Sequence, residues 1–142
     1  MSKANPAGTD GFEFVEFAHP EPEKLAELFT RMGYVPVAKH RTKNITVWRQ
    51  GDINYVVNAE PGSHAMKFVD KHGPCASSMA WRVVDAKHAF DHAVAKGATP
   101  YEGADKALDV PAISGIGGSL LYFIEVYGDK GSAYEAEFDW LG

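Results

Sequence analysis

The sequence predicts an α+β fold in which two βαβββ units form one curved, mostly antiparallel eight-stranded sheet with helices on its outer face. The first half of the chain has the pattern of a strand, an amphipathic helix and three more strands, and the second half repeats this order. An offset of 64 residues aligns Gly33 with Gly97 and Pro36 with Pro100. Because each unit alone would expose one apolar sheet face, we expect the two units to join.

The first unit begins with residues 11–18 (GFEFVEFA), where aromatic and β-branched residues predict a strand. Residues 21–33 follow as an amphipathic helix, with Pro22 in its first turn and Gly33 at its end. Its apolar stripe has helical spacing and consists of Leu25, Leu28, Phe29 and Met32. Short polar turns then separate three strand-like runs, at residues 34–40, 44–50 and 53–58.

The second unit follows a short helical linker at residues 63–73 and consists of a strand at 77–84, a helix at 85–97 and further strands. The glycines of ISGIGGSLLYFIEVYG (113–128) precede a strand, and no Gly-Lys-Ser/Thr follows them. We therefore expect a hairpin turn there and not a phosphate-binding loop.

The predicted organisation is a single domain at residues 11–142, built of two repeats at about 11–60 and 75–138. Residues 1–10 are polar and rich in glycine and proline, so we expect a flexible arm.

The composition excludes several classes of partner. The chain has 142 residues, a net charge of -5 and no cluster of basic residues, which argues against nucleic-acid binding and against an anionic membrane surface. It has no apolar signal core and no run near the ~18 residues that span a membrane. The single cysteine, Cys75, cannot form an internal disulfide. We expect a cytoplasmic protein.

Three further residues have side chains with a possible chemical role. His88 and His92 have the i, i+4 spacing of a zinc pair, but they lie opposite the apolar stripe of their helix and no glutamate follows His88. We interpret them as surface residues. Cys75 is interpreted as a core or linker residue, because no histidine stands at a defined spacing from it.

Five stretches, in order from Gly11 to the end of the chain, resemble the N-terminal domain of bacterial 4-hydroxyphenylpyruvate dioxygenases. They are GFEFVEFA, MGYVPVAKHRTKNITVWRQGDINYVVN, HGPCASSMAWRVVDA, LDVPAISGIGGSLLYFIEVYG and YEAEFDWL. The paired βαβββ arrangement resembles the wider vicinal oxygen chelate superfamily, which has a glyoxalase-like fold and often holds a divalent metal ion inside the cup of its sheet.

The resemblance implies an enzyme that converts 4-hydroxyphenylpyruvate and O2 to homogentisate and CO2 in tyrosine catabolism. Two histidines and one glutamate of the C-terminal domain hold its Fe(II), and that domain is absent from this chain. The chain would then be a non-catalytic scaffold, inactive alone, whose partners are its own C-terminal domain and the other subunits of a homo-oligomer. Two alternatives stay open, a stand-alone glyoxalase-fold protein that binds a small molecule and the N-terminal half of hydroxymandelate synthase.

The metal ligands of the superfamily map onto Phe14, Ser78 and Glu125 of this sequence. Of these only Glu125 suits Fe(II), because Phe14 is apolar and Ser78 supplies a neutral hydroxyl. We interpret the three as degenerate metal-site positions, and we expect no catalytic residue and no metal ion in this chain.

Strand alternation predicts which side chains share the inner face of the cup. On this basis the inner side chains are Phe12, Phe14, Glu16, Ser78, Ala80, Arg82, Leu121, Phe123, Glu125 and Tyr127. A buried carboxylate needs a partner, so Glu125 is expected to pair inside a filled cup, with Arg82 as the candidate.

Overall fold

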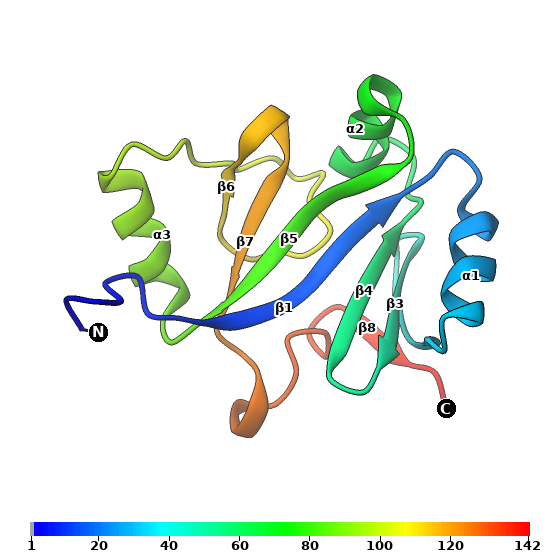
Figure 1. Cartoon of the computed structure of the whole chain (residues 1–142), viewed down its shortest axis with the longest axis horizontal. Coiled ribbons are helices and arrows are strands. Elements are labelled where there is room, and N and C mark those ends of the chain that lie inside the picture. The colour runs from blue at the N-terminus through cyan, green and yellow to red at the C-terminus, as the bar shows by residue number, and fades with distance from the viewer. Residues whose placement is uncertain (1) are drawn as a thin grey trace.

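The computed structural model describes residues 2–142, which form a single mixed sheet (Figure 1). Its eight strands have the order β6-β7-β5-β1-β4-β3-β2-β8. The strands are β1 (Thr9–Ala18), β2 (Val35–His40), β3 (Ile45–Gln50), β4 (Ile53–Asn58), β5 (Cys75–Val83), β6 (Ala112–Ser114), β7 (Leu120–Ile124) and β8 (Phe138–Trp140). The helices are α1 (Pro22–Arg31), α2 (His64–His72) and α3 (Ala86–Ala95), with the short 3-10 turns η1 (Ile116–Gly118) and η2 (Gly128–Lys130).

The predicted fold class is confirmed. The β1–β4 and β5–β7 pairs are parallel and the other neighbouring pairs are antiparallel. Helices α1 and α3 lie at opposite ends of the long central strands β1 and β5 (Figure 1). Within residues 2–142, no helix has the length and apolar character that crossing a membrane requires.

Helix α1 covers the outer face of the first unit. The centroid of the Phe29 ring lies 5.3 Å from that of Phe17 and 5.0 Å from that of Tyr55. Pro22 occupies the first turn, and Gly33, just after the helix, has a φ of +96°. This positive φ favours glycine there, whereas Nε2 of Gln50, which would lie 2.5 Å from a Cβ atom on residue 33, is the end of a flexible side chain that can move.

Helix α3 covers the outer face of the second unit. Asp85 caps it by accepting a hydrogen bond from the backbone N–H of His88 at 3.0 Å. Small residues on its buried side, Ala86 and Ala89, let the helix approach the sheet closely, where they pack with Val83, Ile113 and Phe123. The linker helix α2 is also packed, because Ala65 and Val69 form a buried cluster with Ala18.

The two units share their strand order except at the chain's end. The β1–β4 pair of the first unit corresponds to the parallel β5–β7 pair of the second. Where the first unit has β2, the second has an isolated bridge between Pro100 and Ile113. Strand β8 pairs with β2 at the far edge of the sheet, so the end of the repeat predicted at 75–138 returns to the first unit.

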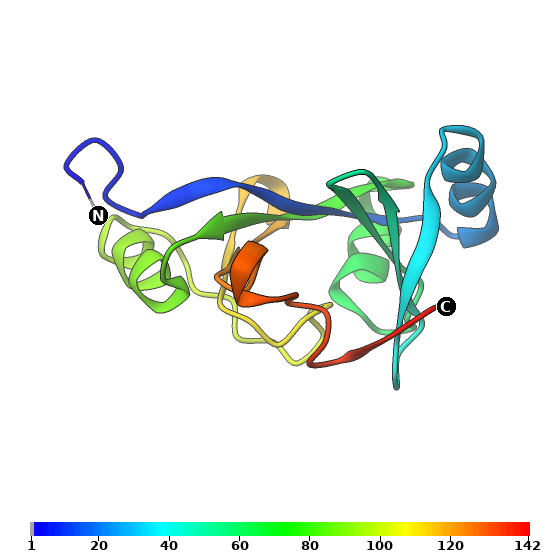
Figure 2. The same ribbon diagram turned by 90° about the horizontal axis from the view of Figure 1, so that it is seen from below.

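The cup is filled by the chain itself. Figure 2 shows the segment between α3 and β6 and the segment between β7 and β8 on one side of the central strands. Leu108 and Tyr134 from these segments, and Phe138 at the start of β8, are buried against the sheet residues Phe14 and Tyr122. The centroid of the Phe14 ring lies 5.6 Å from that of Tyr122 and 6.4 Å from that of Tyr134. The predicted inner face is therefore aromatic and closed to solvent at its centre.

The N-terminal segment, for which the sequence predicts a flexible arm, makes several hydrogen bonds. Strand β1 already begins at Thr9. Asn5 Nδ2 donates a hydrogen bond to the carbonyl oxygen of Thr9 at 2.8 Å, and Asn5 Oδ1 accepts one from Thr9 N at 3.0 Å. The carbonyl of Gly8 accepts a hydrogen bond from Val84 N at 3.0 Å. Met1 lies outside the described residues. The predicted hairpin at 113–128 is confirmed, because β6 and β7 are antiparallel and η1 joins them.

Candidate functional site

The structure brings two of the three predicted metal-site positions to the inner face of the cup. Cross-strand pairing aligns Glu16 with Ser78 and Phe14 with Ala80, so these four side chains share a face of the sheet. Phe14 is 2% exposed and Ser78 is buried. The third position, Glu125, lies elsewhere.

The predicted phase of strand β7 is wrong by one residue. The pair Ala80–Tyr122 places Leu120, Tyr122 and Ile124 on the inner face, whereas Leu121 and Phe123 pack against the elements around α3. Both faces of this strand are apolar. Alternate residues point to opposite faces, but the residue types do not show which of the two alternating sets points inward.

Glu125 follows the end of β7 and is exposed, on the side of α3. Its Oε1 accepts a hydrogen bond from the backbone N–H of Ala86 at 3.0 Å, in the first turn of that helix. A carboxylate there satisfies a free N–H and opposes the positive end of the helix dipole. The predicted pairing of Glu125 with Arg82 is also wrong, because Arg82 binds Glu13.

The carboxylate that lies beside Ser78 is Glu16, which is 1% exposed. Ser78 Oγ donates a hydrogen bond to Oε1, and Asn58 Nδ2 donates one to Oε2 at 2.8 Å. Burial raises the pKa of the Glu16 carboxyl, and the two donors together with the charge of His64 offset part of that rise. Asn58 is itself oriented by Glu60 N, which donates to its Oδ1 at 3.0 Å.

These inner-face residues do not fit an Fe(II) centre. A 2-His-1-carboxylate site needs three convergent ligands with open positions beside them. Both oxygens of Glu16 already accept hydrogen bonds, and its neighbours are a hydroxyl, an amide and the ring of Phe14. Within residues 2–142, no group of three or more His, Cys, Asp or Glu side chains has a metal-binding arrangement.

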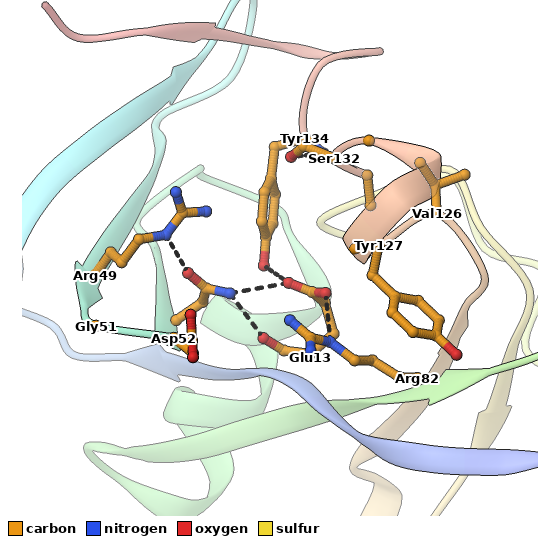
Figure 3. Close-up of a pocket in the computed structure, with 13 residues that line it drawn as sticks. Glu13, Arg49, Gly51, Asp52, Arg82, Val126, Tyr127, Ser132 and Tyr134 are labelled. Atoms are coloured by element: carbon orange, nitrogen blue, oxygen red, sulfur yellow. Dashed lines mark hydrogen bonds and ion pairs between the residues drawn. The ribbon is translucent and has the colours of Figure 1, made fainter.

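A second buried carboxylate, Glu13, forms the most connected polar cluster of the cup (Figure 3). Its Oε1 accepts from Arg82 Nε at 3.0 Å. Its Oε2 accepts from Asn54 Nδ2 and from the hydroxyl of Tyr134, each at 2.9 Å. Burial and the neighbouring Glu13 charge raise the pKa of Tyr134 well above its ordinary value. The cluster joins β1, β4, β5 and the segment before β8.

Strand alternation does not predict this cluster, because β1 contains bulges. The pairing with β5 shifts between Phe12 and Phe14, so an extra residue turns Glu13 toward the cup. Phe12, predicted on the inner face, is instead 58% exposed and packs on Trp81 at 4.6 Å between centroids. A neighbouring register shift lies between Thr9 and Phe12 and contains Gly11, whose φ is +96°. A glycine inside a strand is the sequence signal that could have indicated a bulge in β1.

Beside Glu13 lies an open hollow of about 170 Å³, lined by residues of β1, β3, β4 and β5 and by the loop around η2. Arg49 Nε donates to Asn54 Oδ1 at 2.7 Å, and its guanidinium lies 5.5 Å from the ring of Trp140. The guanidinium of Arg82 lies 5.2 Å from the ring of Tyr127. Two cations held in place at the edge of a hollow can bind an anionic group.

The other residues singled out in the sequence have structural surroundings. His88 is exposed and His92 is half-buried, and Nε2 of His88 lies 2.8 Å from the carbonyl oxygen of Pro6. Burial raises the pKa of the Cys75 thiol, which opposes formation of a nucleophilic thiolate.

Comparison with known proteins places this fold in a family. Residues 3–139 match the family described as "Hydroxyphenylpyruvate dioxygenase, HPPD, N-terminal". Hemolysin VllY of Vibrio vulnificus is 50% identical over 139 residues, which cover 94% of this chain and 39% of that protein. The 4-hydroxyphenylpyruvate dioxygenase of Pseudomonas aeruginosa is 44% identical over 146 residues, covering 99% of this chain and 41% of the enzyme.

A solved structure has the same fold over nearly the whole chain. It is a fusion protein of a xylose isomerase-like TIM barrel and 4-hydroxyphenylpyruvate dioxygenase, with a TM-score of 0.84 and 38% identity. The match covers 93% of this chain and 22% of the fusion protein. The chain spans about two fifths of the length of the first curated relatives that it matches. This chain belongs to the family of N-terminal domains of hydroxyphenylpyruvate dioxygenase.

Proposed function

We propose that this chain is the non-catalytic N-terminal domain of a 4-hydroxyphenylpyruvate dioxygenase that makes homogentisate and CO2 from 4-hydroxyphenylpyruvate and O2 in tyrosine catabolism. The family match over residues 3–139 supports this assignment. The dioxygenase relative is roughly two and a half times as long as the matched region, so a further domain of such a protein would hold Fe(II).

The filled cup is the observation that carries the proposed scaffold role. Phe14, Tyr122 and Tyr134 occupy the space where a ligand of the cup would lie. The inner carboxylates Glu13 and Glu16 are held by donors from the same chain. Filling by packed aromatic rings stabilises a fold but leaves no open coordination position, so the domain supports a catalytic site instead of forming one.

We further propose a domain organisation, a set of partners and a cellular location for this chain. We place the two repeats at about residues 11–60 and 75–138 of one domain, with Phe14 and Ser78 at degenerate metal-site positions. Its partners would be its own C-terminal domain and further subunits of a homo-oligomer in the cytoplasm. Exposed apolar side chains near the chain's end, Trp140 and Leu141, support a docking role for that edge.

The catalytic part of the proposal is tested by assaying two proteins from the same source. The 142-residue chain and the complete native polypeptide are each supplied with Fe(II), ascorbate and 4-hydroxyphenylpyruvate, and homogentisate is measured by chromatography. We expect product only from the native polypeptide. Homogentisate from the 142-residue chain would overturn the scaffold role, and hydroxymandelate from the native polypeptide would indicate the sister synthase.

A second candidate is a domain of a fusion enzyme, which the likeness to the TIM-barrel fusion favours. The matched region is 22% of that fusion protein and 41% of the dioxygenase, so the mass of the native polypeptide separates them. A blot with an antibody raised to residues 1–142 should detect a band roughly two and a half times the 15.5 kDa of this chain for a dioxygenase. A band at 15.5 kDa would indicate a stand-alone binding protein.

A further inference from the structure

The arginines that line the hollow beside Glu13 have unused hydrogen-bond donors. Each oxygen of Glu13 is engaged, Oε1 by Arg82 and Oε2 by both Asn54 and Tyr134. Arg49 and Arg82 each donate through Nε, and within residues 2–142 their terminal nitrogens make no hydrogen bond. A guanidinium has five N–H donors, so most of the donors of both side chains remain free.

Both guanidinium groups are held in place before any ligand arrives. A hydrogen bond from Nε holds one edge of each group, and an aromatic ring lies beside each guanidinium, Trp140 at 5.5 Å from Arg49 and Tyr127 at 5.2 Å from Arg82. Figure 3 shows the two side chains on either side of Glu13. Groups that are already ordered lose little conformational entropy when they bind a ligand.

Two cationic and two anionic side chains line the hollow, so their formal charges cancel, but they are not all paired. Arg82 and Glu13 neutralise each other as an ion pair at 3.0 Å. The guanidinium of Arg49 donates to the neutral amide of Asn54, and within residues 2–142 it forms no ion pair. Asp52, in the turn between β3 and β4, is exposed at the rim and opposes a second negative charge. The free N–H groups of Arg49 therefore suit a small anion with an oxygen edge that two N–H groups can bind, and Asp52 limits the charge that this anion can carry.

We propose that this hollow is a binding site for a small, singly charged carboxylate, with Arg49 as the main contact and Arg82 as the second. Its volume of about 170 Å³ is below the usual range for drug-sized ligands, so it admits a short acid or one carboxylate group. A carboxylate matches the fork of a guanidinium in shape, and a phosphate dianion would be repelled by Asp52. This site is independent of the proposed dioxygenase function.

The test is an NMR titration of the 142-residue chain with sodium acetate, added in place of sodium chloride at constant ionic strength. Holding the ionic strength constant removes general screening from the comparison. We expect saturable shifts of the Nε–H signals of Arg49 and Arg82 and of the backbone amide of Gly51. Signals of Arg31 on α1 should not move.

Three variants separate a specific site from a general charge effect. Arg49→Gln removes the unpaired cation and should weaken acetate binding about ten-fold, as expected for a lost charge-assisted hydrogen bond. Asp52→Asn removes the opposing charge at the rim and should strengthen binding a few-fold, a change that misfolding cannot mimic. Arg31→Gln removes the same charge from an exposed pair on α1 and should leave binding unchanged.

The proposal is overturned if the acetate shifts fail to saturate, or if chloride alone produces them. It is also overturned if Asp52→Asn and Arg31→Gln change the affinity by equal amounts in opposite directions, because the anion would then respond only to net charge. Inorganic phosphate, titrated in the same way near neutral pH, should bind more weakly than acetate to the parent chain. Tighter binding of phosphate would contradict the assignment to a singly charged carboxylate.

Discussion

The hydroxyl of Tyr134 donates a hydrogen bond to Oε2 of Glu13 at 2.9 Å, across 121 residues of sequence. Both side chains are buried, and the bond ties the segment before β8 to the first strand of the fold. Because a buried carboxylate is costly without donors, this contact contributes to stability as well as to position.

Replacing Tyr134 by phenylalanine should therefore lower the free energy of unfolding by about 1.5–3 kcal/mol, the usual cost of losing a hydrogen bond to a charged group. Urea unfolding followed by tryptophan fluorescence measures the change. Tyr127→Phe is the matched control, since it removes a hydroxyl that binds Asp10 at an exposed position and should cost well under about 1 kcal/mol. Equal costs for the two variants would contradict a special role for Glu13.

Truncation of Leu108 should test whether the loop that fills the cup is part of the core. This side chain is 1% exposed, so Leu108→Ala should cost about 2–5 kcal/mol through lost burial and the cavity left behind. Leu28→Ala on α1 is the control, because Leu28 is 48% exposed and alanine favours a helix. Thermal or urea unfolding gives both values, and a neutral Leu108→Ala would mean that the loop is not packed in solution.

The pH dependence of stability should carry a contribution from Glu16. Burial raises the pKa of this carboxyl above 4.5, so the folded chain binds more protons than the unfolded chain as the pH passes 4.5. Its stabilising contribution is full below that pH and is lost as the pH rises through the folded pKa. Relative to the parent chain, Glu16→Gln should gain stability by about 1.4 kcal/mol for each pH unit between the unfolded and the folded pKa of this carboxyl.

Urea unfolding of both proteins between pH 4 and 8 measures this difference. Glu21→Gln provides a comparison of opposite sign, because Lys24 lowers the pKa of the exposed Glu21 carboxyl. A difference between Glu16→Gln and the parent chain that does not vary with pH would contradict the predicted direction.

Glu125 should behave as a helix-capping residue. Glu125→Ala removes the acceptor for Ala86 N at the start of α3 and should cost about 0.5–1 kcal/mol, as other N-terminal contacts of helices do. Glu102→Ala, at an exposed loop position, should cost less. Circular dichroism during thermal unfolding is sufficient to compare them, and a neutral Glu125→Ala would remove the capping role.

The elements of the fold could be predicted from local signals with clear physical causes. Pro22 and Gly33 delimit α1 because proline fits a first turn and glycine accepts the positive φ that ends the helix. The turn at Gly51 gives the β3–β4 hairpin for the same reason. Apolar spacing identifies the buried side of α1 only in part, because Phe29 is buried and Leu25 half-buried while Leu28 and Met32 of the predicted stripe are exposed.

The inner surface of the cup could be predicted only in part. Period-two alternation holds for Ser78 and Ala80 on β5, but it places Glu125 wrongly because Leu120 and Leu121 are equally apolar and do not fix the phase of β7. The bulge that turns Glu13 inward depends on pairing between two strands that are distant in sequence. Composition within one strand does not contain that information.

The return of β8 to β2 gives the molecule an uneven response to mechanical load. A pull on the carboxyl end reaches the ladder between Ala38 and Trp140 first, and the hydrogen bond from Leu141 N to Val37 O at 2.9 Å lies at its outermost point. The bonds from Arg41 to the backbone of Ala136 and to the carboxylate of Asp139 brace the same edge. Force from the end of the chain is thus borne by the first unit, while the second unit, which precedes β8 in sequence, is shielded.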